Sequence, residues 1–176
     1  MGGNFNSRLN LDLREDKGYT YGIYLGFYGN KYNGVFQINT SVKRYATTAS
    51  LAEILTVFNN FVENGVTDTE LEFTKNSLLN EEALKYEDPD QKAYFLSNIV
   101  HYDLDKDYTL KQNQLLKTIS KEEVNQQIKK YFTMNKLTTV IVGDKSIIEN
   151  QLDKAMKNSA NKEVLNKVKL KKISAD

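Results

Sequence analysis

The sequence predicts an α+β fold in which helices pack on one face of a mainly antiparallel sheet, giving two layers. Apolar residues alternate from Tyr19 to Phe27 and again from Val35 to Lys43, on either side of a turn-rich segment, which is typical of a β-hairpin. Amphipathic helical segments then follow without a regular alternation of strand and helix. That order distinguishes the pattern from an α/β fold.

The segment before the hairpin is expected to be a helix that begins at Asn6 or Ser7 and ends at Gly18. Its three leucines alternate, which alone favours a strand. The i, i+4 spacing of Leu9 and Leu13 and the glycine at the end favour the helix.

In the first strand, side chains should alternate between the two faces of the sheet. We therefore expect Tyr21 to share a face with Ile23, Leu25 and Phe27, with Tyr24 on the opposite face. Phe36, Ile38 and Val42 are expected to share a face of the second strand.

Three segments in the middle of the chain have the sequence of a helix start, with a hydroxyl residue three positions before a glutamate. They are Ser50–Glu53, Thr67–Glu70 and Ser120–Glu123. Gly65 is expected to end the first of these helices, and Pro89 to separate the second from another amphipathic helix over Gln91–Tyr102.

The last part of the chain predicts a buried third strand over Leu137–Val142, followed by a helix capped by Asp144 or Ser146. A short further strand is expected around Val164–Ile173. So few strands leave the sheet poorly covered, so we expect one or two N-terminal strands to be missing. We interpret residues 1–176 as a single domain with a tail over 160–176.

Composition excludes several classes of protein. With 40% apolar and 27% charged residues, the composition indicates neither a disordered nor a membrane class, and no apolar run approaches the ~20 residues of a transmembrane segment. No signal peptide is expected at the N-terminus. The formal net charge of +1 argues against a nucleic-acid partner, and the basic residues between Lys162 and Lys172 are interpreted as a solvated tail.

The residues that commonly bind transition metals are almost absent. There is no cysteine, and His101 is the single histidine. A zinc site without cysteine normally needs at least two imidazoles, or imidazoles with a carboxylate, so we expect no metal site and no cofactor in this chain. His101 is interpreted as structural.

The segment from Gly2 to Tyr21 carries the most specific motif. It contains Gly-Gly, Ser-Arg-Leu, then Leu-Arg-Glu-Asp-Lys-Gly and a Tyr-Thr-Tyr ending at Tyr21. This order resembles the C-terminal-domain signature of the pitrilysin/insulinase family of zinc metallopeptidases, and in particular bacterial zinc proteases similar to mitochondrial processing peptidase. The resemblance is dense at the start of the chain and looser after Tyr45.

The resemblance implies a clamshell of two homologous halves. One half carries an inverted zinc motif, His-x-x-Glu-His, which this sequence lacks. The other half carries an Arg and a Tyr seven residues apart, which Arg14 and Tyr21 match. The implied function is the zinc-free half of a zinc metalloendopeptidase, in which Arg14 and Tyr21 bind peptide substrate and stabilise the transition state. Tyr24 is a further candidate for substrate binding.

The implied partner is a zinc-bearing homologous half, in the same polypeptide or in a separate subunit, so the zinc would lie in that partner and this chain alone would be inactive. Alternatives stay open both for the candidate residues and for the domain as a whole. Arg14 can merely pair with Glu15 or Asp12, Tyr21 can be a core residue, and Tyr24 and Tyr28 can pack against a helix. The domain can be a non-catalytic scaffold of the same fold, or an unrelated binding domain. The sequence does not distinguish bacterial periplasm from cytoplasm.

Overall fold

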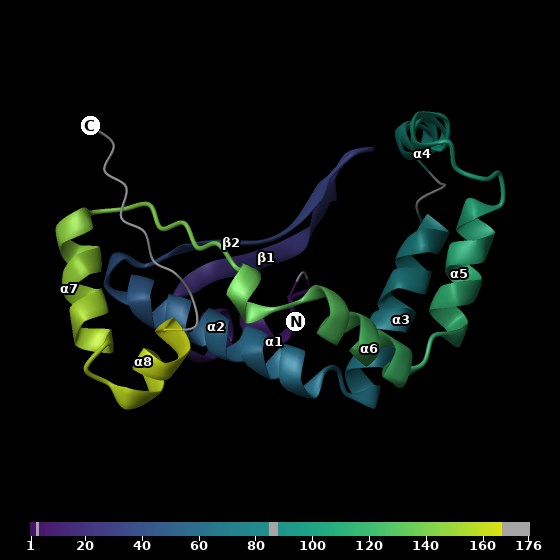
Figure 1. Cartoon of the computed structure of the whole chain (residues 1–176). Coiled ribbons are helices and arrows are strands. Elements are labelled where there is room, and N and C mark those ends of the chain that lie inside the picture. Colours follow the sequence, from purple (N-terminus) through teal and green to yellow (C-terminus); the bar gives the residue numbers. More distant parts are fainter. Residues whose placement is uncertain (3, 85–87, 167–176) are drawn as a thin grey trace. The chain divides into compact units, whose positions relative to one another are not determined.

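The structure, a computed structural model, describes residues 1–2, 4–84 and 88–166 (Figure 1). The chain clusters into two compact units, one formed by residues 1–64 together with the segment from Lys129 onward, the other by residues 65–128. Each unit is described by itself below. The assignment of the whole chain to one domain stays a prediction.

The first unit contains the hairpin and the helices that cover it. Its elements are α1 (Arg8–Asn10), the π-helix η1 (Leu11–Asp16), β1 (Thr20–Gly29), β2 (Gly34–Val42), the 3-10 turn η2 (Arg44–Ala46), α2 (Thr47–Asn64), the 3-10 turn η3 (Met134–Lys136), α7 (Lys145–Ala155) and α8 (Ser159–Leu165). Strands β1 and β2 pair antiparallel, with Leu25 opposite Ile38 and Gly29 opposite Gly34. The predicted hairpin and the α+β class are confirmed.

The main core lies between one face of the hairpin and the helices beneath it. Leu9, Leu13 and Ile23 are fully buried together, and Ile54 and Val57 of α2 pack against them. Burying each of these side chains stabilises the fold by about 2 kcal/mol. Helices therefore cover this face of the sheet, as the two-layer prediction requires.

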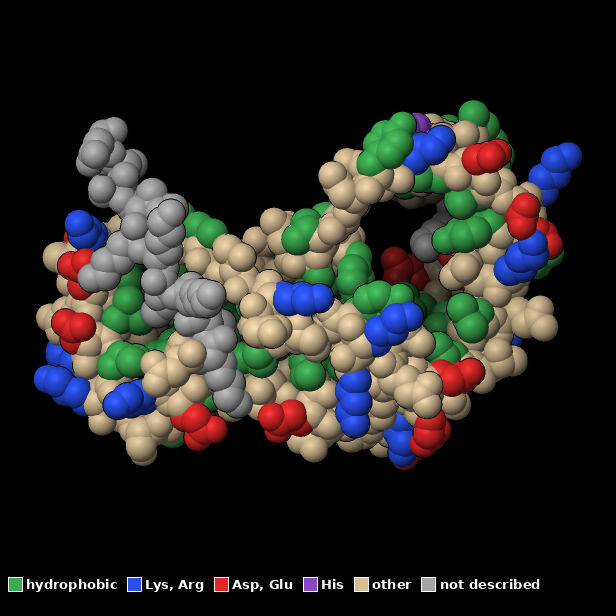
Figure 2. Space-filling view, in the orientation of Figure 1, with side chains coloured by type: hydrophobic (Ala, Val, Ile, Leu, Met, Phe, Trp, Pro, Cys, Tyr) green, Lys and Arg blue, Asp and Glu red, His purple; other side chains and the backbone are tan. Residues whose placement is uncertain are grey.

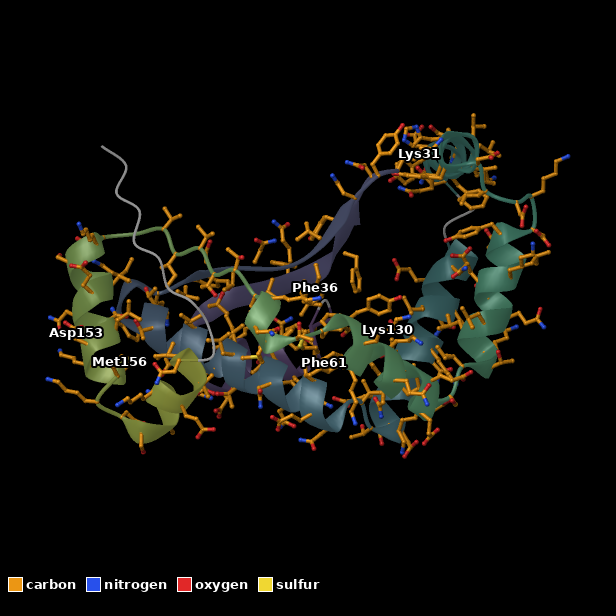
Figure 3. All side chains as sticks on the ribbon, viewed as in Figure 1. Lys31, Phe36, Phe61, Lys130, Asp153 and Met156 are labelled. Atoms are coloured by element: carbon orange, nitrogen blue, oxygen red, sulfur yellow. The ribbon has the colours of Figure 1, made fainter. Side chains whose placement is uncertain are left out.

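Phe132 holds the far end of the hairpin to α2. The centroid of its ring lies 4.8 Å from that of Phe36 in β2 and 5.8 Å from that of Phe27 in β1. The ring centroids of Phe58 and Phe61 in α2 lie 6.0 and 5.9 Å away. All four pairs are edge-to-face, an arrangement that the ring quadrupoles favour. Figure 3 labels Phe36 and Phe61 on the two elements that this ring joins.

The predicted third strand is wrong. Residues 137–142 pair with no strand among the described residues. Leu137 and Ile141 pack against the buried cluster of Leu51, Leu55 and Leu165, while Val140 and Val142 are 80% and 93% exposed. The side chains are therefore alternately packed and exposed, and the backbone lacks the hydrogen-bonding neighbour that a strand requires.

The end of the chain also differs from expectation. Val164 and Leu165, predicted to begin a short strand, belong to helix α8, and Leu165 is buried against α2. Asn158 caps this helix by accepting hydrogen bonds from Ala160 N and Asn161 N. The rest of the predicted strand lies outside the described residues.

The second unit consists of helices. They are α3 (Asp68–Leu84), α4 (Pro89–Tyr102) and α5 (Tyr108–Thr118), followed by the start of α6 (Lys121–Tyr131). The predicted capping boxes at Thr67–Glu70 and Ser120–Glu123 are confirmed by reciprocal hydrogen bonds. Pro89 stands in the first turn of α4, as its missing N–H allows. Helix α5 was not predicted.

Several apolar side chains of this unit are open to solvent. On α4, Tyr94, Leu96 and Val100 are 67%, 61% and 82% exposed. Figure 2 shows apolar side chains on the surface of this part of the molecule. No helix within the described part of the chain is long and apolar enough to cross a membrane.

The predicted capping box at Ser50–Glu53 is wrong, because α2 begins three residues earlier, at Thr47. Ser50 is buried inside the helix and its hydroxyl has no hydrogen-bond partner.

Gly65 follows the end of α2 with a φ of +68°, as expected of a helix stop. At α7 the cap is Asp144, whose carboxylate accepts a hydrogen bond from Ile147 N.

Candidate functional site

Arg14 is carried by an unusual helix. After one turn of α-helix the backbone widens to a π-helix, in which Lys17 N donates to Asp12 O, five residues back, at 3.0 Å. Gly18 then adopts a φ of +61°, and Tyr19 N donates to Leu13 O at 2.8 Å. The predicted helix and its stop at Gly18 are confirmed. This reversal brings the start of β1 back beside the end of the helix.

Asn10 ties the helix to the strand. Its side-chain amide donates to Ile23 O at 3.2 Å and its carbonyl accepts from Ile23 N at 3.1 Å. The same amide group lies within hydrogen-bond distance of Asn4 O and Ser7 Oγ. Asn10 is only 6% exposed, so these hydrogen bonds form away from solvent and are costly to lose.

The hairpin is irregular at the point where Asn10 binds. Thr20 pairs with Val42 but Ile23 pairs with Thr40, so β1 carries one extra residue there, as in a β-bulge. Thr20 Oγ1 fills the irregularity, lying 2.7 Å from Ser41 O and accepting from Gly22 N at 3.1 Å.

The bulge corrects the predicted position of Tyr21. Regular alternation placed Tyr21 on the face of Ile23, but the extra residue puts Thr20 in the inward position, 8% exposed. Tyr21 is instead 94% exposed while Ile23 is fully buried. Tyr21 is therefore not a core residue, and its hydroxyl is available to a ligand.

Arg14 and Tyr21 line the same open cavity, of about 560 Å³. The cavity lies at the reversal between helix and hairpin and is lined by Arg14, Glu15, Gly18, Tyr19, Thr20, Tyr21, Ser41, Val42 and Lys43. Tyr24, the third predicted site residue, does not line it. Its ring bends back along the strand, with its hydroxyl 3.4 Å from the point where a Cβ of Gly22 would stand.

The guanidinium of Arg14 has two neighbours. Its Nε lies 3.2 Å from a carboxylate oxygen of Glu15, which is the local ion pair that the sequence left open as an alternative. Its Cζ lies 4.5 Å from the centroid of the Phe5 ring, a cation–π arrangement. The Arg14 side chain is still 40% exposed, so this pair is weak and does not remove the guanidinium from solvent.

An ion-pair network connects the end of the helix that contains Arg14 to α2. Lys17 bonds to Asp12 and lies 3.6 Å from Glu53 of α2. The hydrogen bond to Asp12 raises the pKa of Lys17 above its ordinary value, partial burial opposes this rise, and Glu53 adds to it. The network therefore connects the helix that carries Arg14 to α2.

Sequence reasoning missed Phe5 and Asn10 as parts of this site. Gly2 shows how tightly the segment before the helix packs, since a Cβ there would stand 2.2 Å from Leu25 Cδ2 of β1. A detectable signal was the polar Asn10 between the apolar Leu9 and Leu11. Phe5 carried no such signal, because its role depends on a fold that brings it to Arg14.

His101 and the acidic residues form no metal centre in the described segments, where no three His, Cys, Asp or Glu side chains cluster. His101 is exposed on α4, with its ring 4.7 Å from that of Tyr102.

The similarity to known proteins concerns the fold and the N-terminal part of the chain, which contains this cavity. Residues 1–78, which include every residue of the candidate site, match the family described as Peptidase M16 inactive domain. A solved structure, the peptidase M16 inactive domain from Pseudomonas fluorescens, is similar with a TM-score of 0.68 and 26% sequence identity over 75% of this chain.

A curated relative extends the similarity along the sequence. The chain is 28% identical over 145 residues, or 82% of its length, to a protein of Helicobacter pylori named "Non-peptidase homolog YmxG". The chain spans about a third of the length of both proteins, 34% of the relative and 32% of the solved chain.

Proposed function

We propose that this chain is the metal-free half of a two-half zinc metalloendopeptidase, in which it binds peptide and stabilises the transition state. The observation that supports this most is that Arg14 and Tyr21, seven residues apart, both line one open cavity. A zinc-bearing homologous half would supply the metal. This chain would supply hydrogen-bond donors aimed at the substrate.

The chemistry of the pair suits that role. Attack of a zinc-activated water on an amide gives a negatively charged oxygen, and donors placed around it lower the barrier. Tyr21 can donate its hydroxyl without carrying charge. Arg14 can hold a carbonyl or carboxylate of the substrate with two parallel N–H groups. Its present pairing with Glu15 is exposed, so substrate can compete for the guanidinium.

A second candidate is a non-catalytic scaffold of the same fold. The observation in its favour is the similarity to a protein that is itself named a non-peptidase homolog. On this view Arg14 and Tyr21 serve binding to a partner and no bond is cleaved. Fold alone does not separate the two candidates, because related folds often keep their structure after losing chemistry.

The test is hydrolysis of a quenched fluorescent peptide by the complete protein, with the zinc-bearing half present. We expect Arg14→Ala and Tyr21→Phe each to lower kcat by about 100-fold, the typical cost of removing one transition-state donor. Matched controls are Arg44→Ala and Tyr32→Phe, which alter side chains 71% and 89% exposed and outside the cavity. Unchanged cleavage by both site variants would contradict the catalytic role, and absence of any cleavage would favour the scaffold.

A further inference from the structure

The cavity of Arg14 and Tyr21 holds a second cation, Lys43. This residue follows directly after β2, and its N–H donates to Tyr19 O at 2.8 Å, which fixes its backbone at the end of the hairpin. The side chain extends over the reversal between helix and strand. Its Nζ lies 4.0 Å from the point where a Cβ of Gly18 would stand.

Gly18 lies beside this ammonium. Apart from the adjacent residues Lys17 and Tyr19, only Lys43 Nζ comes within 4 Å of that Cβ position in the described structure. Gly18 is itself placed between Arg14 and Tyr21 along the chain, and all three residues line the cavity with Lys43. The ammonium therefore borders the same space as the two proposed substrate-binding groups.

The charges around this space are unbalanced. Arg14, Lys43 and Glu15 are the charged residues that line it, which leaves a net charge of +1. Glu15 is paired with Arg14, whereas Lys43 has no ion pair within the described part of the chain. The neighbouring cations Lys17 and Arg44 are engaged elsewhere, with Asp12 and Asp144.

Hydroxyl groups complete an environment suited to an anion. Tyr21 and the exposed Ser41 also line the cavity, and each carries a hydroxyl that can donate a hydrogen bond. A carboxylate accepts several hydrogen bonds at once, and bonds in which one partner is charged are the stronger ones. A neutral group at the same place would leave the ammonium unpaired.

We propose that Lys43 is a specificity-determining residue that binds a carboxylate of the peptide held in this cavity. The carboxylate belongs to an Asp or Glu side chain near the cleaved bond or to the C-terminus of a short peptide. This inference rests on the proposed function in taking a peptide as the occupant. It adds a charge preference to the site, because Tyr21 is uncharged and Arg14 is assigned to the substrate carbonyl while its charge is partly offset by Glu15.

The test is a titration of the complete protein with labelled peptides, in which fluorescence anisotropy measures binding. One pair of peptides differs only in Glu against Gln at each position around the cleaved bond, and a second pair in a free against an amidated C-terminus. We expect the acidic member of one pair to bind roughly fivefold more tightly, which is the scale of a partly exposed ion pair, and the preference to fall at high salt.

Substitutions of Lys43 test whether this residue causes the preference for acidic peptides. In Lys43→Gln the ratio of the two Kd values should fall to about one, and in Lys43→Glu it should invert. The control is Lys31→Gln, an exposed lysine in the hairpin turn outside the cavity, which should keep the wild-type ratio (Figure 3). An acidic preference that persists in Lys43→Gln would overturn the proposal.

The outcomes also separate this inference from the proposed function. Peptides that bind through Arg14 and Tyr21 without any charge preference would contradict the role of Lys43 alone. Failure of every peptide to bind would contradict both. Which peptide pair shows the preference identifies the source of the carboxylate.

Discussion

The side chain of Asn10 takes the place of a strand neighbour for Ile23. It binds both the N–H and the C=O of Ile23, at 3.1 and 3.2 Å. Asn10 lies one helical turn before Arg14, and Ile23 lies two residues after Tyr21. This single buried amide therefore fixes the distance between the two elements that carry the proposed substrate-binding groups.

Replacing Asn10 with Leu should destabilise the domain by about 2–4 kcal/mol, because it leaves two buried backbone groups of Ile23 without partners. The free energy of unfolding, from urea titration, measures this. Asn6→Ala, which changes an exposed residue of the same segment, should stay within about 0.5 kcal/mol of wild type. Equal effects of the two substitutions would mean that the Asn10 hydrogen bonds contribute little.

Phe5 should influence substrate binding through Arg14. Its ring faces the guanidinium at 4.5 Å, and we expect Phe5→Leu to weaken peptide binding because it removes this contact. A double-mutant cycle with Arg14→Ala isolates the interaction, with an expected coupling of about 0.5–1 kcal/mol. If Phe5→Leu weakens binding as much in the Arg14→Ala background as in wild type, the ring acts independently of Arg14.

The sequence predicted the elements of the site better than their geometry. The hairpin, the helix and the stop at Gly18 follow from local patterns, because alternation and glycine conformation are properties of neighbouring residues. The outward position of Tyr21 does not follow from local patterns. It depends on a β-bulge, in which β1 has one more residue than β2 between two paired positions. The environment of Phe5 and Asn10 depends on contacts between segments that periodicity does not describe.

The failed strand over Leu137–Val142 has the same origin. The apolar run was read as a strand buried on both faces, but only Leu137 and Ile141 pack against the core, and Val140 and Val142 are exposed. A strand also needs a hydrogen-bonding neighbour, and the described sheet consists of β1 and β2 alone. Local sequence indicates which side chains are buried but not which backbone lies alongside.

Gly18 should be required for its conformation rather than for space. Its φ of +61° disfavours a residue with a Cβ, but a Cβ there would meet only the mobile end of Lys43 at 4.0 Å. Gly18→Ala should therefore cost about 1–2 kcal/mol. Gly18→Asn, whose side chain tolerates this region, should cost less. Equal losses for the two variants would indicate a steric cause.

Gly65 provides the contrasting case. Its φ of +68° is similar, but a Cβ there would stand 2.1 Å from Asn125 Oδ1, the atom that accepts a hydrogen bond from Val66 N at 2.9 Å. Gly65→Ala should therefore cost more than Gly18→Ala, because Asn125 must move and give up its bond. Urea unfolding of both variants ranks the two losses.

Asp144 should make stability depend on pH at acidic values. Hydrogen bonds from the Ser146 hydroxyl and Ile147 N–H, and then the charge of Arg44, lower the pKa of Asp144 below its ordinary 3.8. The folded state therefore favours the ionised carboxylate. Its contribution to stability is fully present above pH 3.8 and is lost as the pH falls through the lowered pKa of the folded state.

The comparison of wild type with Asp144→Asn checks this dependence, because the amide keeps a cap acceptor and removes the charge. The difference in urea midpoint should be constant near neutral pH and should shrink as the pH falls below about 4. Ser146→Ala removes the largest cause of the lowered pKa, so it should move the loss of stability to a higher pH, closer to 3.8. A midpoint difference that stays constant down to pH 2 would mean that the Asp144 charge does not stabilise the fold.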